Sequence, residues 1–235
     1  MEQIKRYLEF IILFGFVLIY GLSAYQRNLA WKDDVTLWSD VVKKSPEKAR
    51  AHNNLGVGFN KKGLPHEAIS SLKESLRLKP DYMEAYVNLG NSYIKMGLID
   101  EAISAYIQAL SLKPDDVKAQ INLAGAYGAK GWLDKAIYIL KGLLEAYPHE
   151  PLAHYNLGIA YNLKGLKELA VMELEEVIRL EPGNIQGLYY LGEIYLYDMR
   201  DPVSALFYYE RILSIDPGHH YAREARGMIK EIRGK

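Results

Sequence analysis

Residues 85–114 read AYVNLGNSYIKMGLIDEAISAYIQALSLKP, and this stretch decides the fold. Before Gly97 the apolar residues recur at the spacing of one helix face, as Leu89 and Tyr93 do. A glycine adopts the left-handed conformation of a helix end at little cost, so we expect the first helix to end at Gly97. A second amphipathic helix then runs toward Pro114, which cannot continue it. The stretch therefore predicts two helices joined by a short turn.

The same pattern recurs along the chain with a period of 34 residues. Leu-Gly pairs, an aromatic residue three places later, a turn glycine and an alanine all keep this step, which indicates a repeat architecture. The prolines that close the pattern are Pro46, Pro80, Pro114, Pro148, Pro182 and, one residue late, Pro217. Five whole units follow, at residues 49–82, 83–116, 117–150, 151–184 and 185–219. In the last unit Met199 replaces the turn glycine and one residue is added, so we expect a distorted turn between intact helices.

This helix-turn-helix pattern resembles the tetratricopeptide repeat (TPR). The residues of unit 83–116 at the signature places of that family are Leu89, Gly90, Tyr93, Gly97, Ala102, Tyr106, Ala109 and Pro114. The resemblance implies an all-α fold, a right-handed α-solenoid of helix hairpins whose concave groove binds peptide segments or partner proteins. The aromatic residues Tyr93, Tyr127, Tyr161 and Tyr195 are expected to pack as wedges between hairpins.

The two ends of the repeat array are expected to shield it from water. Residues 31–48 carry only the second-helix places of a repeat, which predicts a lone opening helix, a half repeat. Residues 220–235 carry an apolar stripe with charged residues opposite, as a C-terminal capping helix requires. The domain organisation is thus an N-terminal segment at 1–30, the half repeat, five units over 49–219 and the cap.

The N-terminal segment contains an uncharged apolar run over residues 10–25. Extended to residues 8–25, this run reaches the lower limit for a transmembrane helix, and residues 1–30 are interpreted as a membrane anchor. A cleaved signal peptide and a buried helix of a soluble protein are the alternatives. The basic residues on both sides of the run leave its orientation open.

Composition and motifs exclude several classes of function. The chain has 235 residues, and its 29 basic and 29 acidic side chains balance, which argues against a nucleic-acid partner. Cysteine is absent, which excludes disulfides, thiolate metal sites and a cysteine nucleophile. No phosphate-binding glycine loop, nucleophile elbow or zinc-protease motif occurs, and the six histidines are interpreted as packing or surface residues. We therefore expect no enzyme activity, no cofactor and no metal site.

Candidate binding residues lie at equivalent places in the first helix of each unit. An asparagine precedes the Leu-Gly or Leu-Ala pair in four successive units, and resembles the asparagine ladder of the O-linked N-acetylglucosamine transferase repeats. A primary amide can pair with the N–H and C=O of an extended peptide, although asparagine is also common at this place for local packing. Tyrosines at first-helix places and one lysine complete the expected groove. The candidate groove residues are Asn54, Asn88, Asn122, Asn156, Lys118, Tyr155, Tyr189 and Tyr197.

Three functional hypotheses follow. The first is a membrane-tethered TPR interaction module that binds a peptide or protein partner in its groove. The second is a non-catalytic substrate-binding tail or partner of a membrane glycosyltransferase, because residues 27–56 resemble the junction between the last membrane helix and the TPR array in protein O-mannosyltransferase-like enzymes. The third is an assembly scaffold for a membrane complex. The glycosyltransferase resemblance favours a single-pass membrane protein with an extracytoplasmic array. The oligomeric state is not indicated.

Overall fold

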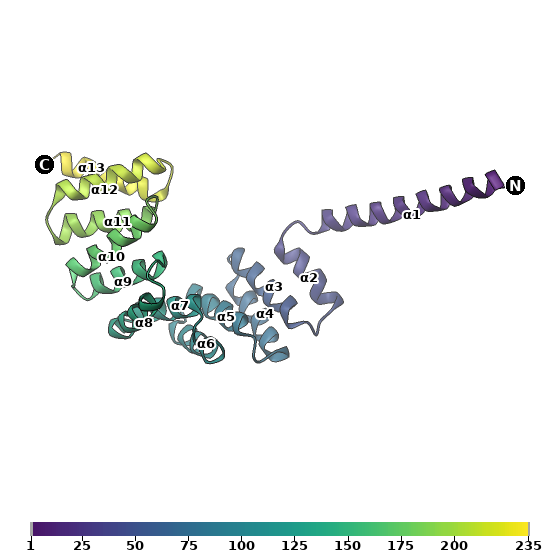
Figure 1. The fold of residues 1–235 in the computed structure, drawn as a ribbon, viewed down its shortest axis with the longest axis horizontal. Coiled ribbons are helices and arrows are strands. Elements are labelled where there is room, and N and C mark those ends of the chain that lie inside the picture. The colour runs from purple at the N-terminus through teal and green to yellow at the C-terminus, as the bar shows by residue number, and fades with distance from the viewer. Residues whose placement is uncertain (1, 235) are drawn as a thin grey trace. The chain divides into compact units, whose positions relative to one another are not determined.

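The computed structural model describes residues 2–234, without the side chains of residues 2–5, 8, 9 and 26–30. Its described part contains thirteen α-helices and one π-helix, and no β-strand (Figure 1). The prediction of an all-α fold is confirmed. The chain divides into two compact units, one up to Gly97 and one from Leu98 onward.

The first unit contains five helices. They are α1 (Glu2–Ala30), α2 (Asp34–Lys44), α3 (Ala49–Lys61), α4 (Pro65–Leu78) and α5 (Met83–Lys95). In sequence order, α2 packs on α3, α3 on α4 and α4 on α5. Asp33 caps α2, because its carboxylate accepts the Thr36 N–H at 3.0 Å while the Thr36 hydroxyl accepts the Asp33 N–H at 3.2 Å. Residues 31–48, predicted to be a half repeat, thus contain a single capped helix that packs on α3.

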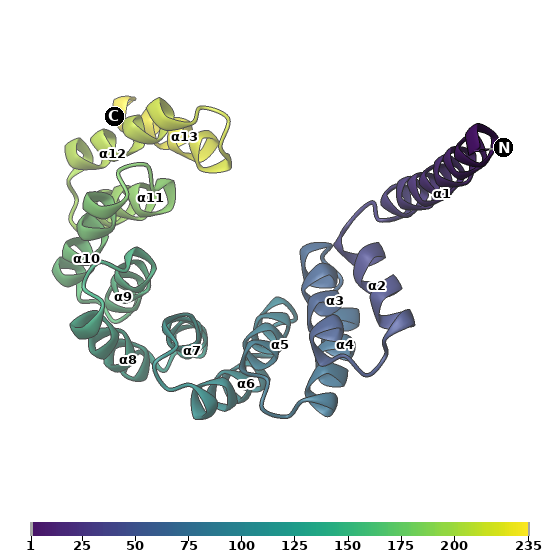
Figure 2. The ribbon, with the colours of Figure 1, turned by 45° about the vertical axis from the view of Figure 1, so that its right-hand side comes forward.

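The second unit contains the remaining helices. They are α6 (Ile99–Leu112), α7 (Val117–Ala129), α8 (Leu133–Ala146), α9 (Pro151–Leu163), α10 (Lys167–Leu180), α11 (Ile185–Glu193), the π-helix η1 (Ile194–Asp198), α12 (Pro202–Ile215) and α13 (His220–Arg233). Figure 2 shows α7, α9 and α11 along one side of this unit and α8, α10 and α12 along the other. The terminal helix α13 packs on α12 and α11. The hydrophobic core runs between the two rows of helices and includes the fully buried Leu140, Leu174 and Tyr209.

Glycine makes the turn inside four of the hairpins, as the repeat pattern predicts. Gly63, Gly97, Gly131 and Gly165 have φ between 73° and 82°, a conformation that disfavours side chains with a Cβ. The fifth turn differs: Met199 has φ −89° and the positive φ, 56°, falls on Arg200. The extra residue of this unit is accommodated by η1, in which the Met199 N–H donates to the Ile194 carbonyl five residues earlier at 3.0 Å. The expected distortion is therefore a short π-helix that shifts the turn by one residue.

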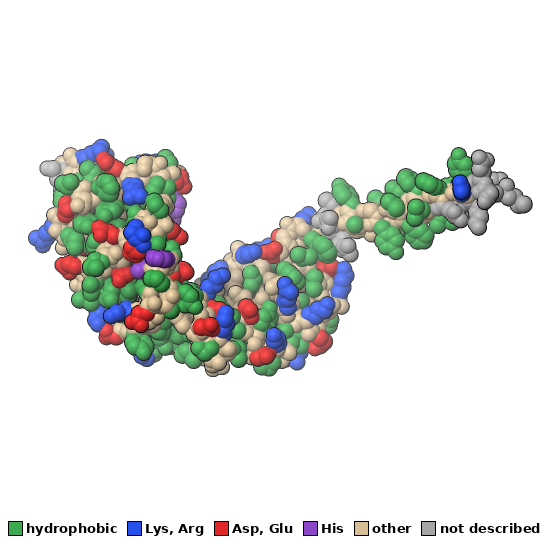
Figure 3. Space-filling model, in the orientation of Figure 1, with side chains coloured by type: hydrophobic (Ala, Val, Ile, Leu, Met, Phe, Trp, Pro, Cys, Tyr) green, Lys and Arg blue, Asp and Glu red, His purple; other side chains and the backbone are tan. Residues whose placement is uncertain are grey.

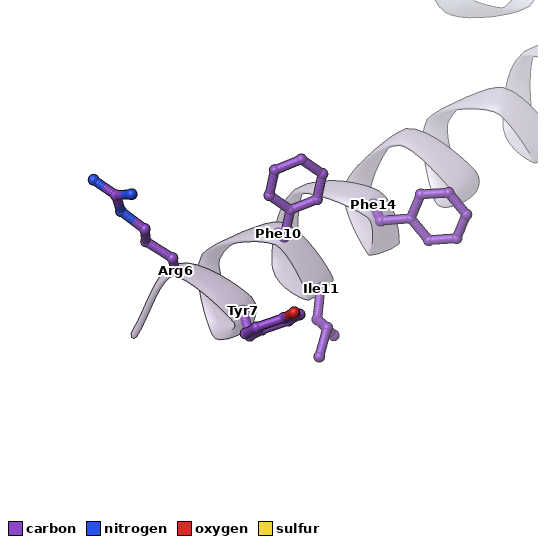
Figure 4. A pocket seen from close by; sticks show the side chains of 5 residues that line it. All are labelled: Arg6, Tyr7, Phe10, Ile11 and Phe14. Atoms are coloured by element: carbon purple, nitrogen blue, oxygen red, sulfur yellow. The ribbon is translucent and has the colours of Figure 1, made fainter. Parts of the chain in front are cut away.

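The first helix, α1, exposes its apolar side chains. The large apolar side chains described from Tyr7 to Tyr25 are between 49% and 74% exposed, so the helix is not the buried element that one alternative required. Figure 3 shows hydrophobic atoms along this helix. In Figure 4, Tyr7, Phe10, Ile11 and Phe14 project in different directions around its axis, and with Arg6 they line a hollow of about 540 Å³.

The predicted transmembrane helix is not supported. In the described part of the chain, no helix is both long and apolar enough to cross a membrane. The uncharged run over residues 10–25 spans only about 24 Å at 1.5 Å per residue, less than the ~30 Å hydrocarbon core of a bilayer. The predicted span began at residue 8, and the side chains of residues 8 and 9 lie outside the description.

Candidate functional site

The candidate site is a hollow between α7 and α9, which pack against each other. The α7 helix begins at a carboxylate cap, since Asp116 accepts the Ala119 N–H at 3.0 Å. The α9 helix begins with Pro151, a residue suited to the first turn. The hollow has a volume of about 230 Å³ and is lined by Ala124, Gly125, Gly128, Ala129, Ala136, Asn156, Ile159, Ala160 and Leu163.

The hollow exists because α7 lacks side chains on this face. A Cβ added to Gly125 would meet only the Asn156 side chain, at 3.9 Å, and one added to Gly128 would meet nothing within 4 Å. Across from these glycines, α9 contributes Ile159 and the exposed Leu163. The result is an apolar recess with one polar group, the Asn156 carboxamide, which is the composition of a site that takes a side chain and orients the backbone attached to it.

The Asn156 carboxamide makes no hydrogen bond to any other described residue of the protein. It is partly buried, so both its donors and its acceptor lie at the recess with their bonding capacity unused. A partly buried amide gains most from a partner that supplies both a donor and an acceptor, as a peptide unit does. Asn156 therefore fits the role that the sequence predicted for the whole row of asparagines.

The other asparagines of that row are in different surroundings. In the first unit Asn88 donates to the Asn53 carboxamide oxygen at 2.9 Å, and Asn53 donates to the Asn54 oxygen at 3.1 Å. These two candidates thus share a side-chain network, which is the local-packing alternative left open by the sequence. Asn122 also has an interaction partner. A continuous ladder of ligand-binding amides stays a prediction.

The remaining candidate residues, one lysine and three tyrosines, differ in their surroundings. Lys118 is exposed on the first turn of α7 and does not line the hollow. Tyr155 is partly buried, and its ring lies perpendicular to that of Tyr190 at a centroid distance of 5.8 Å. Tyr197 is 56% exposed and its hydroxyl donates to the Met228 sulfur at 3.3 Å, which ties it to α13.

The expectation that Tyr189 lines an open groove is wrong. Its side chain is only 7% exposed, its ring stacks on Tyr221 at 4.5 Å and a second ring, Tyr209, lies at 6.0 Å. The C-terminal helix α13 supplies Tyr221, whereas the equivalent Tyr155 in α9 lies against Tyr190 of α11. Tyr189 is therefore a core residue.

Two carboxylates beside Tyr189 were not among the sequence-predicted residues. The carboxyl groups of Glu224 in α13 and Glu193 in α11 lie near the Tyr189 hydroxyl. Burial raises the pKa of the Glu193 carboxyl, and the nearby negative charge of Glu224 raises it further. The repeat register could have revealed Glu193, because it occupies the place of Ile159 and Gly125 in earlier units.

No metal centre is found in the residues that the structure describes. No group of three or more His, Asp or Glu side chains lies close enough together to hold an ion there. His154 pairs with Glu173 at 2.7 Å and His52 bonds the Pro46 carbonyl at 2.7 Å, so both side chains have structural partners. His219 caps α13 through the Tyr221 N–H at 3.3 Å.

Family models described as tetratricopeptide repeat match residues 49–82, 84–116 and 152–184. Solved structures share the fold at low identity. TTC0263, a thermophilic TPR protein of Thermus thermophilus, is 23% identical with a TM-score of 0.66, over 80% of this chain and 100% of that chain. MamA from residue 41 to its end, from Desulfovibrio magneticus RS-1, is 21% identical with a TM-score of 0.63, over 73% of this chain and 97% of that chain.

A third similar structure is YrrB, described as a TPR protein with an unusual peptide-binding site. It is 19% identical with a TM-score of 0.57, over 81% of this chain and 97% of that chain. No curated protein matches the chain. The family models match repeats only, so the proposed relation of residues 27–56 to glycosyltransferases stays a prediction.

Proposed function

Because the chain contains tetratricopeptide repeats, we propose that it is a non-enzymatic interaction module that binds an extended peptide segment of a partner protein on the face formed by α7 and α9. The proposal is carried by one observation, the free Asn156 carboxamide at the edge of an apolar recess. The amide pairs with a backbone N–H and C=O of the peptide, and the recess takes an apolar side chain next to that peptide unit. YrrB, which has a similar fold, is itself described as having a peptide-binding site.

The test uses Gly125→Leu, a substitution that fills the recess without touching the core. Leucine has a higher helix propensity than glycine, and its Cβ would meet only the Asn156 side chain, at 3.9 Å, so we expect the helices to be retained. Short random peptides are selected for binding to the full-length chain, and the affinity of the best one is measured by fluorescence anisotropy. We expect Gly125→Leu to weaken it by more than about tenfold, equivalent to about 1.4 kcal/mol.

The matched control is Gly227→Leu in α13, where an added Cβ meets nothing within 4 Å and which is remote from the recess in the repeat order. This variant should bind the peptide as the wild type does. Asn156→Leu should weaken binding as Gly125→Leu does, because it removes the polar partner. Equal affinity of wild type and Gly125→Leu would show that the peptide binds elsewhere and would refute the proposed site.

We further propose that α1 attaches the protein to a lipid bilayer by inserting its apolar segment. The support is the continuous exposure of large apolar side chains from Tyr7 to Tyr25, which water solvates poorly. Full-length protein should float with neutral phospholipid vesicles in a density gradient. The double substitution Leu13→Glu and Val17→Glu should leave it in the dense fractions, whereas the same change at the surface sites Ser104 and Ser111 of α6 should not. Which side of the membrane the repeats occupy stays a prediction.

A further inference from the structure

A cluster of tyrosine rings lies where α9, α11 and α13 follow one another. The Tyr190 ring is nearly perpendicular to Tyr155, at 74° and 5.8 Å, and to Tyr189, at 84° and 6.3 Å. Tyr189 in turn stacks on Tyr221 of α13. Two rings that meet at right angles enclose a corner, and the ring faces that line it carry partial negative charge. Such corners attract cations.

Two carboxylates lie beside these rings, and neither is neutralised by the protein. Glu193 and Glu224 both lie near the Tyr189 hydroxyl, and their negative charges repel each other. No basic side chain lowers the pKa of Glu193. Among the ion pairs of the described residues, none includes Glu193 or Glu224. Burial has already raised the pKa of Glu193, so the cluster holds a carboxylate in surroundings that disfavour its charge. A cation bound there would relieve both the burial penalty and the repulsion.

The chemistry of the cluster selects among possible cations. A guanidinium group is planar, stacks on aromatic faces, is less strongly hydrated than an ammonium and donates to more than one carboxylate at once. An ammonium group would be attracted by the same carboxylates, but it stacks less well on the tyrosine rings. Tyr155, which forms one corner, immediately precedes Asn156, so one helix, α9, contributes a residue to the cluster and to the proposed peptide site.

We propose that Tyr155, Tyr190, Glu193 and Glu224 form a binding site for the guanidinium group of an arginine in the partner peptide. This inference rests on the proposed peptide-binding function for the identity of the ligand, but the site itself is defined by the rings and carboxylates alone. Two experiments therefore separate it from that function.

The first experiment probes the site without a peptide. Methylguanidinium chloride is titrated into full-length protein labelled with ¹³C in its tyrosine rings, in a non-ionic detergent that covers α1. We expect saturable shifts of the Tyr155 and Tyr190 resonances with half-saturation on the order of millimolar. The neutral isostere methylurea and sodium chloride should produce none. Shifts that do not saturate, or that methylurea reproduces, would overturn the inference.

Variants then assign the effect to these side chains. Glu193→Gln with Glu224→Gln should abolish the saturable shift, whereas Glu101→Gln with Glu168→Gln, an equal change in net charge at exposed sites, should preserve it. Tyr190→Leu should also abolish it and Tyr190→Phe should retain it, because the ring face is what binds the cation. Far-UV circular dichroism confirms that each variant keeps its helices.

The second experiment links the site to peptides. Immobilised short peptides carrying arginine, lysine, citrulline or norleucine at one position are probed with full-length protein. We expect arginine to exceed citrulline by about tenfold or more, with lysine between them, and the double glutamine variant to lose this preference alone. Gly125→Leu should lower binding of all four series. Binding without an arginine preference would refute the cation site and keep the peptide function. Saturable shifts with methylguanidinium but no binding of any peptide would keep the cation site and refute the peptide function.

Discussion

At the scale of single residues, Gly192 of α11 leaves no room for a side chain against Tyr209 of α12. A Cβ there would lie 2.6 Å from Tyr209 Cε1 and 2.8 Å from Cζ, and that ring is fully buried. Gly192→Ala should lower the free energy of unfolding by about 1–3 kcal/mol through overpacking. Gly227→Ala, at an open helical site, should raise it by about 0.5–1 kcal/mol. Urea unfolding followed by circular dichroism measures both. Similar midpoints for the two variants would contradict this packing account.

Glu193 makes stability depend on pH at the same scale. Its pKa is raised in the folded state, so its contribution to stability is fully present below the unfolded carboxyl pKa and is lost as pH rises through the folded value. Glu193→Gln removes the charge and should be more stable than wild type at pH 7. The advantage should vanish near pH ~3.5, below the ordinary glutamate pKa, where both side chains are neutral. Thermal unfolding across this range tests the sign, with Glu168→Gln as the exposed control. An advantage that does not change with pH would exclude a carboxylate effect.

At the scale of elements, η1 shows how the fifth hairpin accommodates its additional residue. In the turns at Gly63, Gly131 and Gly165 the aromatic carbonyl accepts an N–H five residues later, as Tyr161 does from Leu166 at 2.9 Å. In the fifth turn Tyr195 accepts from Asp201 at 2.8 Å, six residues later. The additional residue is therefore absorbed between Tyr195 and Asp201, and the left-handed position moves to Arg200.

This register shift predicts opposite effects of glycine at two adjacent positions. Arg200→Gly should raise the free energy of unfolding by about 1 kcal/mol, because a left-handed backbone disfavours any residue with a Cβ. Met199→Gly should lower it by about 1 kcal/mol or more, since Met199 has a negative φ and packs on the core. Thermal denaturation compares the two. The reverse order would mean that the turn keeps the register of the other repeats.

At the scale of the whole molecule, repeats transmit stability mainly to their neighbours. Leu174 and Leu72 are fully buried at equivalent places in the second and first compact units. Leu174→Ala should remove about 2–5 kcal/mol of protection from hydrogen exchange in α9–α12 and leave α3 and α4 unchanged. Leu72→Ala should have the converse effect. A uniform loss over all helices in either variant would show that the two units unfold as one.

Much of this protein was determined by its sequence alone. The 34-residue phase of proline, Leu-Gly and aromatic residues predicted the helix pairs, because each marker has a local conformational reason. Glycine at the turns predicted the left-handed positions from Gly63 to Gly165. In the fifth unit Met199 stands in place of the turn glycine, which predicted that the last turn would be distorted. These features depend on residues a few places apart, which the sequence displays directly.

The tertiary structure alone decided which equivalent residues are available to a ligand. Asn88 and Asn156 occupy the same place in their repeats, but Asn88 donates to Asn53 of the preceding repeat, whereas Asn156 faces Gly125 and remains unbonded. Tyr155 and Tyr189 are equally matched, and only Tyr189 is buried by a capping helix. The repeat period sets the position of a side chain on its own helix, but its partner comes from a neighbouring hairpin, and only packing brings the two together.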